Sequence, residues 1–379
     1  MLSRRSRAVR PGRCRFVIPI PESLGGITSE WLTAVLRASG LLEAGTASVS
    51  GVQRVGADSG YASQVGRIRT GFDGCVTSLP DSMIVKLAAP GTNASWSEFI
   101  AEKYARECAF YTPVWPDAGV RTPVCYFAAH EAETRRVVLL LEDLGTARFG
   151  DAESSWSQDE AESIVDALAG LHAKWWNHPS LDSWRWLPLF GDGTAQLEKL
   201  PGRRSVFLDR YREVVSPDLR ELTLRLGQQV ADRLRRLSAT PRTLLHGDLH
   251  LDNVAFPGGE TGKPVLFDWQ CVAKGLGVVD LALFITMGSP EHRRMGEQNL
   301  IRRYHARLAA AGVTGYSLET LMDDYLVALL RCWIGIVNGY GSPNAEAWAA
   351  RQSRMALQSV RWWNDMAQDH DLAGLIAAS

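Results

Sequence analysis

A short stretch in the second half of the chain concentrates side chains that could do chemistry. It holds five polar residues directly after the apolar residues 244–245: His246, Asp248, His250, Asp252 and Asn253. A second apolar run, 265–267, ends at Asp268. Carboxylates at the ends of buried strands are costly unless a cation or a proton-transfer task holds them there. Asp248, Asn253 and Asp268 form H-x-D-x-x-x-x-N followed by D-[FW]-x, the base and oxygen-ligand set for phosphoryl transfer from ATP.

The spacing of these three residues fits that reaction. Asp248 is suited to orient a hydroxyl group and take its proton. Mg²⁺ prefers oxygen ligands and uses only one or two protein carboxylates, and Asn253 and Asp268 can supply an amide and a carboxylate oxygen. The alternative is a polar loop with aspartate as a turn former, which a lone H-x-D would favour. With Asn253 and Asp268 both in register, the sequence favours phosphoryl transfer.

The same stretch contains two histidines whose spacing resembles that of a zinc-binding pair. His246 and His250 are four positions apart, but a zinc pair of that spacing requires a helix. Here the two histidines lie in a glycine-containing loop after a strand, so no zinc site is expected. The two apolar runs, joined by Gly-Gly and Gly-Lys-Pro, predict a pair of strands with a turn between them.

A second group of candidate residues lies upstream. Lys86 is the one charged residue of the apolar strand predicted over 83–87, on the same face as Ile84. In the helix predicted over 95–112, Glu107 falls on the apolar stripe centred on Ile100, whereas Glu98 and Glu102 fall on the opposite face. A buried carboxylate should be paired, and Lys86 is the obvious partner. The alternative for Lys86 is an edge-strand lysine that prevents aggregation.

Two further segments could bind a nucleotide. The turn from Gly56 through Gly60 to Ser63 could place backbone N–H groups and the Ser63 hydroxyl over phosphates, although most glycine turns are only hairpins. A strand over 137–141 ends at Glu142-Asp143-Leu144, where backbone groups could bind the adenine edge; the alternative is a strand ending in a turn. From Ser157, which can cap a helix, the composition becomes helical.

Length and composition restrict the protein class. A chain of 379 residues exceeds what one core usually serves, so two lobes are expected. A net charge of −1 argues against nucleic acid as the main partner. The basic segment 4–15 lacks the apolar core of a signal peptide and is interpreted as a disordered tail, and no 18-residue apolar span predicts a membrane crossing. Six cysteines without C-x-x-C spacing fit reduced thiols in a cytoplasmic protein.

The motifs together resemble the aminoglycoside phosphotransferase and choline kinase group of the protein-kinase-like superfamily. The resemblance covers nearly all of the chain after about Pro19. It is carried by LLHGDLHLDN (244–253), LFDWQ (266–270), VVDLA (278–282), LLLEDL (139–144) and LAGLHA (168–173). SMIVKL (82–87), ECAFY (107–111) and ITSEWLTAVL (27–36) look most like the ecdysteroid-kinase-like (CHK) branch. Trp269 stands where many relatives carry Phe, a conservative departure.

The resemblance implies an α+β bilobal protein-kinase-like fold. It has a small N-lobe over 19–143, with an antiparallel sheet and one main helix, and a large, mostly helical C-lobe over 144–379; residues 1–18 form the tail. Transferred to matching positions, Asp248 would be the catalytic base, and Asn253 and Asp268 the magnesium ligands. The nucleotide-binding residues would be Lys86, Glu107, Gly56, Gly60, Ser63, Glu142 and Leu144. ATP is the implied co-substrate, and His250 and Asp252 receive no role.

The leading hypothesis is therefore an ATP- and Mg²⁺-dependent kinase that phosphorylates a hydroxyl group of a small organic molecule: an antibiotic, a sugar, an amino alcohol or a hydroxylated lipid. A catalytically inactive pseudokinase that senses nucleotide or binds protein is the alternative, and the complete residue set disfavours it. A protein kinase is disfavoured because Asp280, expected to brace the catalytic loop, follows Asp268 by only twelve positions. That leaves no room for a peptide-docking activation segment.

Overall fold

The protein is described by a computed structural model that covers residues 18–55, 63–74, 77–89, 94–190, 194–258, 262–348 and 350–377. Gly56, Gly60 and the expected tail up to residue 17 lie outside these ranges. The chain forms two compact units. The first consists of Met1–Ala118 and Thr122–Thr146, and the second of Gly119–Arg121 and Ala147–Ser379.

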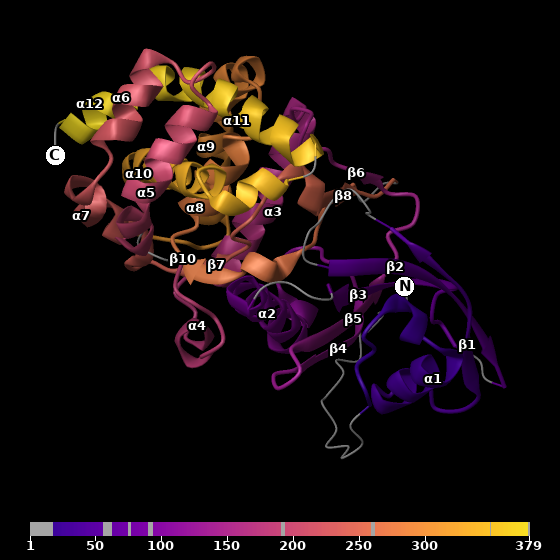
Figure 1. Ribbon diagram of the computed structural model, residues 1–379. Helices are drawn as coiled ribbons and strands as arrows, with labels where there is room; N and C mark the ends of the chain where they lie inside the picture. Colours follow the sequence, from indigo (N-terminus) through magenta and orange to yellow (C-terminus); the bar gives the residue numbers. More distant parts are fainter. Residues whose placement is uncertain are drawn as a thin grey trace. The chain divides into compact units, whose positions relative to one another are not determined.

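In the described part of the first unit, five strands form an antiparallel sheet in the order β1-β2-β3-β5-β4 (Figure 1). They are β1 (Thr46–Arg54), β2 (Ser63–Asp73), β3 (Ser82–Ala88), β4 (Cys125–Glu131) and β5 (Arg136–Glu142). β3 is the central strand, and Lys86 lies opposite Val65 of β2 and Leu139 of β5. A lysine at this position cannot protect a sheet edge, which excludes the edge-strand alternative.

The two faces of this sheet carry different helices. Met83, Val85 and Leu87 pack in a core cluster with Trp31 and other residues of α1 (Ser29–Ala38), whose N-cap Thr28 accepts a hydrogen bond from Trp31 N at 3.2 Å. Because side chains alternate along a strand, Lys86 points to the other face, which α2 (Ala94–Ala109) covers. α2 ends three residues before the predicted helix end and continues as a π-turn that contains Pro113, a residue that lacks an N–H donor.

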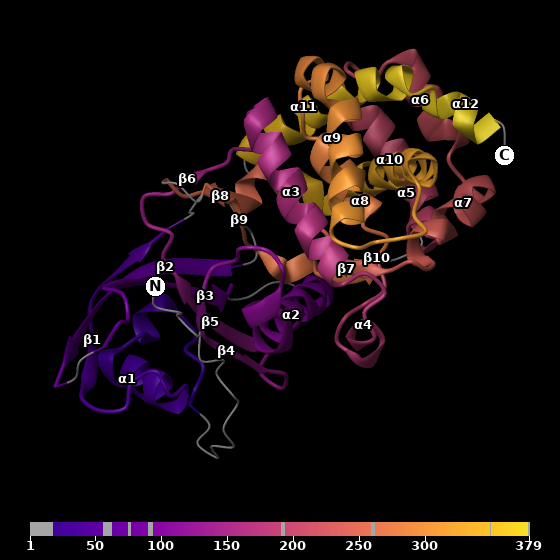
Figure 2. The same ribbon diagram turned by 180° about the vertical axis from the view of Figure 1, so that it is seen from behind.

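The second unit is mostly helical (Figure 2). Its helices are α3 (Gln158–Lys174), α4 (Ser180–Ser183), α5 (Thr194–Arg210), α6 (Pro217–Arg225), α7 (Ala231–Arg235), α8 (Val278–Ile285), α9 (Pro290–Ala310), α10 (Leu318–Tyr340), α11 (Ala350–Asp369) and α12 (Leu372–Ala377). Ser157 caps α3, as its sequence predicted, and it also forms a full capping box with Glu160. α3 and α9 lie side by side, joined by Arg303 and Arg307, which both bind Asp166.

The pattern of residues 219–237 is helix-like, but these residues do not form one continuous helix. The chain leaves helical geometry at Leu226, passes through an extended Gly227, and resumes as α7. Glycine costs about 1 kcal/mol in a helix relative to alanine, which makes this the natural point for the break.

Short strands position the chemically important loop in the second unit. β7 (Thr243–Leu245) pairs with β10 (Ala273–Gly275), and β8 (Val254–Phe256) pairs with β6 (Arg148–Phe149) and β9 (Val265–Leu266). Both apolar runs of the sequence are strands, as predicted. However, β7 and β9 do not pair with each other. β9 pairs with β8, the strand that follows β7, and β7 pairs with β10, the strand that follows β9.

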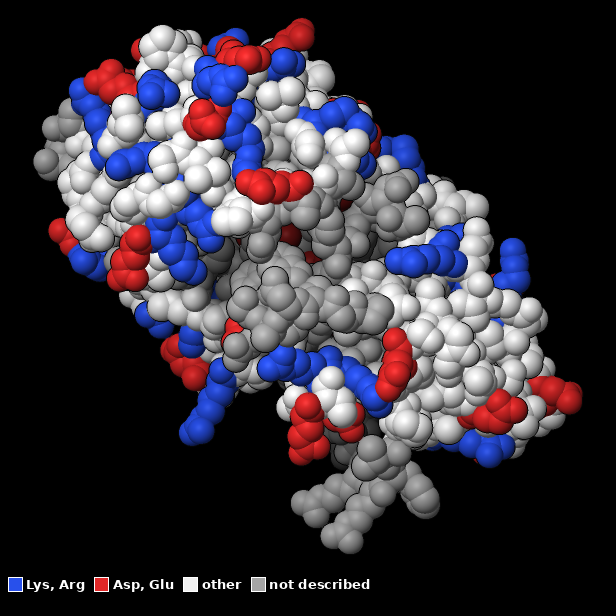
Figure 3. Space-filling model, in the orientation of Figure 1, with Lys and Arg blue, Asp and Glu red and all other residues white. Residues whose placement is uncertain are grey.

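In both units, Lys and Arg side chains are interspersed with Asp and Glu side chains on the face shown in Figure 3. None of the described helices has the length and apolar character needed to cross a membrane. The structure thus shows a mixed α and β protein with an antiparallel sheet and many helices, the fold class that the sequence predicted.

Candidate active site

The loop that follows β7 is held by a buried carboxylate. Asp280, at the start of α8, is fully buried and accepts hydrogen bonds from the backbone N–H groups of His246 at 2.6 Å and Gly247 at 2.9 Å. Gly247 has φ +79°, and a Cβ at this position would lie 2.2 Å from the carbonyl oxygen of Cys271. Only glycine fits this close approach, so residue 248 leaves the strand in a direction that an ordinary residue at 247 would prevent.

Asp248 lies half-buried directly after this turn. The Cys271 Sγ lies 3.7 Å from its Oδ2 and is a weak donor at most. Among the described residues, Asp248 forms no salt bridge, although several arginine–carboxylate pairs occur elsewhere in the unit. A carboxylate that no cation neutralises is able to accept a proton from a substrate.

Asn253 is oriented by its neighbours. Its Nδ2 donates to the backbone carbonyl of Asp248 at 2.9 Å and lies 3.1 Å from His250 Nε2. Because a carbonyl oxygen can only accept, the atom facing it must be the amide nitrogen, and the Asn253 Oδ1 points elsewhere. The side chain therefore ties the two ends of the loop together while leaving an amide oxygen as a potential metal ligand.

Strand pairing brings Asp268 next to Asn253. In the β8–β9 hairpin, Val254 lies opposite Leu266, and the Phe267 N–H donates to the Asn253 carbonyl at 3.1 Å. Asp268 then adopts a left-handed conformation with φ 64° and ψ 67°. Such a conformation is strained for a residue with a Cβ and is found preferentially at functional sites. The structure thus brings Asp248, Asn253 and Asp268 together at one end of the hairpin.

The donor set in this loop fits magnesium. One amide oxygen and one or two carboxylates are what Mg²⁺ takes from a protein when substrate phosphates and water complete its shell. No group of three or more His, Cys, Asp or Glu side chains within the described residues is arranged to hold a metal by itself. The residues present would therefore hold Mg²⁺ together with a phosphorylated ligand rather than as an all-protein site.

The histidines near the loop have structural environments. His246 is fully buried, and its Nε2 lies 3.0 Å from the Phe267 carbonyl. Burial lowers the pKa of His246 below its ordinary value, although the nearby carboxylates of Asp280 and Asp248 oppose this. His172 of α3 is also fully buried, with its Nδ1 2.7 Å from the hydroxyl of Tyr304 and its Nε2 3.4 Å from Asp280. His172 is a core histidine, and it extends the support of Asp280 to α9.

In the first unit, Lys86 and Glu107 form the ion pair that the sequence predicted. Lys86 Nζ lies 2.8 Å from one carboxylate oxygen of Glu107 and 3.0 Å from the other. Only 7% of Lys86 and 1% of Glu107 are exposed. Glu102, on the opposite face of α2, is exposed. The pair fixes the position of a cation on the central strand.

The remaining predicted nucleotide-binding residues of this unit lie at the ends of strands. Ser63 begins β2 opposite Ala88, whereas Gly56 and Gly60 of the same turn lie outside the described residues. Glu142 ends β5, and its Oε2 accepts from the Val124 N–H at 2.9 Å. Leu144 follows at a half-buried position. Between them, Asp143 binds Arg67 through two hydrogen bonds of 2.7 and 3.1 Å.

Sequence reasoning missed two contributors to the loop in the second unit. Tyr304 binds His172, and Arg351 binds Asp252, a residue to which the sequence gave no role. Each partner lies about a hundred positions or more away along the chain. Arginine and tyrosine in amphipathic helices give no signal of such contacts, so only an observed spatial neighbour could have identified them.

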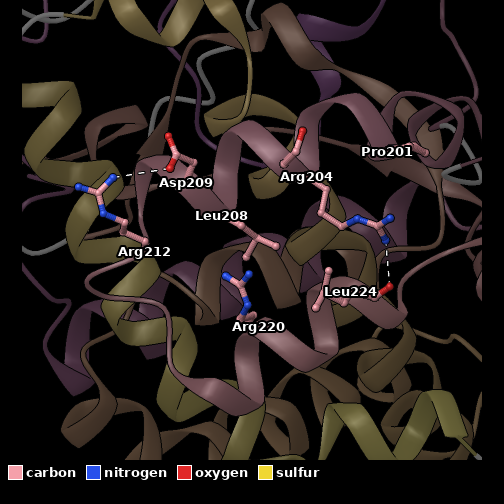
Figure 4. Close-up of a pocket in the computed structure, with 8 residues that line it drawn as sticks. Pro201, Arg204, Leu208, Asp209, Arg212, Arg220 and Leu224 are labelled. Atoms are coloured by element: carbon pink, nitrogen blue, oxygen red, sulfur yellow. Dashed lines mark hydrogen bonds and ion pairs between the residues drawn. The ribbon is translucent and has the colours of Figure 1, made fainter.

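A pocket of about 600 Å³ opens between α5 and α6 (Figure 4), but none of the predicted site residues lines it. Three of its lining residues are arginines. Arg204 donates to the Leu224 carbonyl at 2.9 Å, and Arg212 lies 3.6 Å from Asp209. The Arg204 contact joins the two helices, whereas the Arg212 contact lies at the C-terminal end of α5. The pocket is not assigned to the active site, because its lining contains none of the predicted site residues.

Comparisons with known proteins agree with this geometry. No curated protein sequence matches the chain significantly. Solved structures with similar folds include the following three. The GDP and kanamycin complex of APH(2")-IIia is 13% identical, with a TM-score of 0.54 over 85% of this chain and 95% of that one. The GDP complex of an aminoglycoside 2'-phosphotransferase-IIIa is 14% identical, with a TM-score of 0.53 over 85% of this chain and 94% of that one. A spectinomycin phosphotransferase in complex with ADP and spectinomycin is 12% identical, with a TM-score of 0.51 over 93% of this chain and 98% of that one.

At the sequence level, residues 75–318 match a family described as the phosphotransferase enzyme family, APH. The match covers more than half of the chain and includes every predicted catalytic and metal-binding residue. The narrower placement in the ecdysteroid-kinase-like branch is not part of this match. The chain therefore belongs to the APH phosphotransferase enzyme family and is a small-molecule kinase.

Proposed function

We propose that this enzyme transfers the γ-phosphoryl group of ATP, bound with Mg²⁺, to a hydroxyl group of a small organic molecule. The observation that carries the proposal is the end of the β8–β9 hairpin, where Asn253 and Asp268 lie beside the loop that holds Asp248. A general base next to an amide and a carboxylate oxygen is the set that phosphoryl transfer requires.

Asp248 is the proposed catalytic base. It would orient the hydroxyl group of the acceptor and take its proton as the oxygen attacks phosphorus. Its carboxylate forms no ion pair among the described residues, and Asp280 fixes the backbone before it. The hydrogen bond from Asn253 to the Asp248 carbonyl keeps the base and the amide ligand at a constant separation.

Asn253 and Asp268 are the proposed magnesium ligands. Bound Mg²⁺ would neutralise the charge that develops on the phosphate oxygens. The left-handed backbone of Asp268 sets the direction of its carboxylate, and the hydrogen bond from Phe267 to Asn253 fixes the two ligands relative to each other. This rigidity suits a cation that demands near-octahedral geometry.

In the first unit, Lys86 is proposed to bind the α- and β-phosphates, with Glu107 holding it in position. The turn from Gly56 to Ser63 is proposed to cover the phosphates, and Glu142 to Leu144 to bind the adenine edge. The motifs SMIVKL and ITSEWLTAVL are the basis for proposing the ecdysteroid-kinase-like branch. A cytoplasmic location is also proposed, since Cys108, Cys125 and Cys332 are buried thiols.

The acceptor is proposed to be a small molecule with a free hydroxyl group: an antibiotic, a sugar, an amino alcohol or a hydroxylated lipid. Two of the similar structures contain kanamycin or spectinomycin, which supports including antibiotics among the candidates. A peptide acceptor is disfavoured because α8 begins ten residues after Asp268, which leaves no segment long enough to dock a peptide.

The test is an ATP- and GTP-consumption screen against these acceptor classes, followed by Asp248→Asn. The variant should lose about a hundred- to ten-thousand-fold in turnover, because a positioned base contributes about 10²–10⁴-fold and the neutral amide cannot replace it. Its nucleotide affinity, measured by thermal shift with Mg²⁺, should change little. Unchanged turnover in this variant would refute the assignment. Nucleotide binding without phosphorylation of any acceptor would instead favour the inactive module.

A further inference from the structure

Helix α11 lies beyond the residues that match the phosphotransferase family, yet it contacts the loop that carries the proposed metal ligand. Arg351, Arg354 and Gln358 share one face of this helix because they are three and four positions apart. Arg354 donates to both carboxylate oxygens of Glu153 at 2.7 and 3.2 Å, and Gln358 donates to the Glu153 carbonyl at 3.0 Å. The helix is thereby attached to the segment that follows β6 (Figures 1 and 2).

Arg351 reaches further than its neighbours on the same face. Its guanidinium binds Asp252 through both Nη atoms, with Nη1 2.7 Å from Oδ2 and Nη2 2.9 Å from Oδ1. Nη2 also lies 2.7 Å from Asp151. A bidentate arginine–carboxylate pair fixes orientation as well as distance. Only 23% of the Arg351 side chain and 20% of the Asp252 side chain are exposed, so water competes little for this pair.

Asp252 immediately precedes Asn253 in a single 3-10 turn, Leu251–Asn253. The other side of this turn is also held. The Ala152 N–H donates to Asp252 at 2.8 Å, and the Gly150 N–H donates to the Val254 carbonyl at 2.9 Å. A Cβ at Gly150 would lie 2.3 Å from the Leu251 carbonyl, which shows how closely the two backbones approach. The turn is therefore fixed between the segment 150–152 and helix α11.

We propose that Arg351 is a positioning residue, which acts through Asp252 to hold Asn253 and Asp248 in the arrangement used for magnesium and the acceptor hydroxyl. The inference rests on the proposed function of those two residues. A one-turn segment has little stability of its own, because forming it fixes several dihedral angles for one hydrogen bond. Since Asn253 donates to the Asp248 carbonyl, a displacement of Asp252 moves both groups.

The test compares Arg351→Gln and Asp252→Asn with the matched control Arg354→Gln. All three variants remove an ion pair that joins α11 or the loop to its surroundings, but Arg354 does not touch Asp252. Two quantities are measured in each: hydrogen–deuterium exchange of peptides spanning 246–254, and the Mg²⁺ concentration for half-maximal turnover. We expect faster exchange and a magnesium requirement raised about ten-fold in the first two variants only, the usual size of an outer-shell effect.

Two additional variants sharpen the result. The double variant Arg351→Gln with Asp252→Asn should lose less than the sum of the two single changes, because both remove the Arg351–Asp252 interaction. Arg351→Lys keeps the charge but not the bidentate geometry and should recover only part of the effect. The positioning role is overturned if Arg354→Gln matches Arg351→Gln, or if exchange in 246–254 is unchanged. Exchange is independent of catalysis, so it still reports on Arg351 if Asp248→Asn retains turnover and the proposed function fails.

Discussion

The two units hold their proposed functional groups in different ways. In the first unit, Lys86 and Glu107 extend from a central strand and a helix, and the two side chains satisfy each other. In the second unit, Asp248 lies in a loop whose backbone is in neither a helix nor a strand. There a buried carboxylate, Asp280, binds main-chain N–H groups instead of a cationic side chain. One arrangement positions a side chain, whereas the other positions the backbone itself.

This difference has an energetic consequence. A buried pair of opposite side-chain charges can be replaced as a unit by apolar residues, often at no cost in stability. Main-chain N–H groups cannot be removed, and a buried donor without an acceptor costs about 1–3 kcal/mol. The first unit should therefore tolerate a matched double substitution at its ion pair, whereas the loop in the second unit depends on Asp280 without an alternative.

The largest expected effect is that of Asp280→Ala. This change leaves the N–H groups of His246 and Gly247 buried without their acceptor, and we expect a loss of about 4 kcal/mol in the free energy of unfolding. Urea denaturation followed by tryptophan fluorescence measures it. Asp166→Asn is the control, because among the described residues that carboxylate binds only Arg303 and Arg307, in a partly exposed position. This substitution should cost about 1 kcal/mol or less. Equal losses in the two variants would contradict the backbone-holding role.

The next effect concerns the ion pair of the first unit. Glu107→Gln removes the carboxylate that neutralises Lys86 and should cost about 3 kcal/mol. The double variant Lys86→Met with Glu107→Leu should recover most of this stability while remaining inactive, since the proposed phosphate-binding cation is gone. The exposed Glu102→Gln on the same helix is the control, with an expected change of about 0.5 kcal/mol or less. A double variant less stable than Glu107→Gln would show that the Lys86–Glu107 pair cannot be replaced as a unit. The ion pair would then resemble the Asp280-supported loop in this respect.

The same contrast explains what the sequence could predict. Lys86 stands out as a charge in an apolar strand, and Glu107 as a charge on an apolar helical stripe, so their pairing follows from burial alone. The strands that flank Asp248 follow from equally local patterns, whereas the fold class was implied by the family resemblance. In the second unit, the H-x-D-x-x-x-x-N spacing identified residues that the structure brings together, although their catalytic roles stay predictions.

What the sequence could not predict is set by long-range contacts. Strand β7 pairs with β10 rather than with the next apolar run, because pairing partners depend on topology and not on local periodicity. The Arg351–Asp252 pair joins two polar positions 99 residues apart, neither of which is unusual for an exposed surface.

The smallest expected effect concerns Asp143. Its pH dependence tests whether side-chain charge pairing stabilises the first unit at this position. Burial alone would raise the pKa of this carboxyl group, but hydrogen bonds from Arg67, Ser82 and the Gly145 N–H outweigh it and hold the pKa below its ordinary value of 3.8. A carboxylate whose pKa is lower in the folded than in the unfolded state stabilises the fold above the unfolded value. That contribution is lost as the pH falls through the folded value.

Asp143→Asn should therefore cost about 2 kcal/mol at pH 7, the range for hydrogen bonds to a charged group. The difference in unfolding free energy between the native protein and the variant should stay constant from pH 7 to about pH 5 and shrink below about pH 4. Urea denaturation of both proteins at each pH measures it, and taking the difference cancels the other carboxylates. A difference that grows as the pH falls would mean that Asp143 is held by its neighbours in the protonated form. The first unit would then not rely on charge pairing at this position, and the contrast with the Asp280-supported loop would be confined to Lys86 and Glu107.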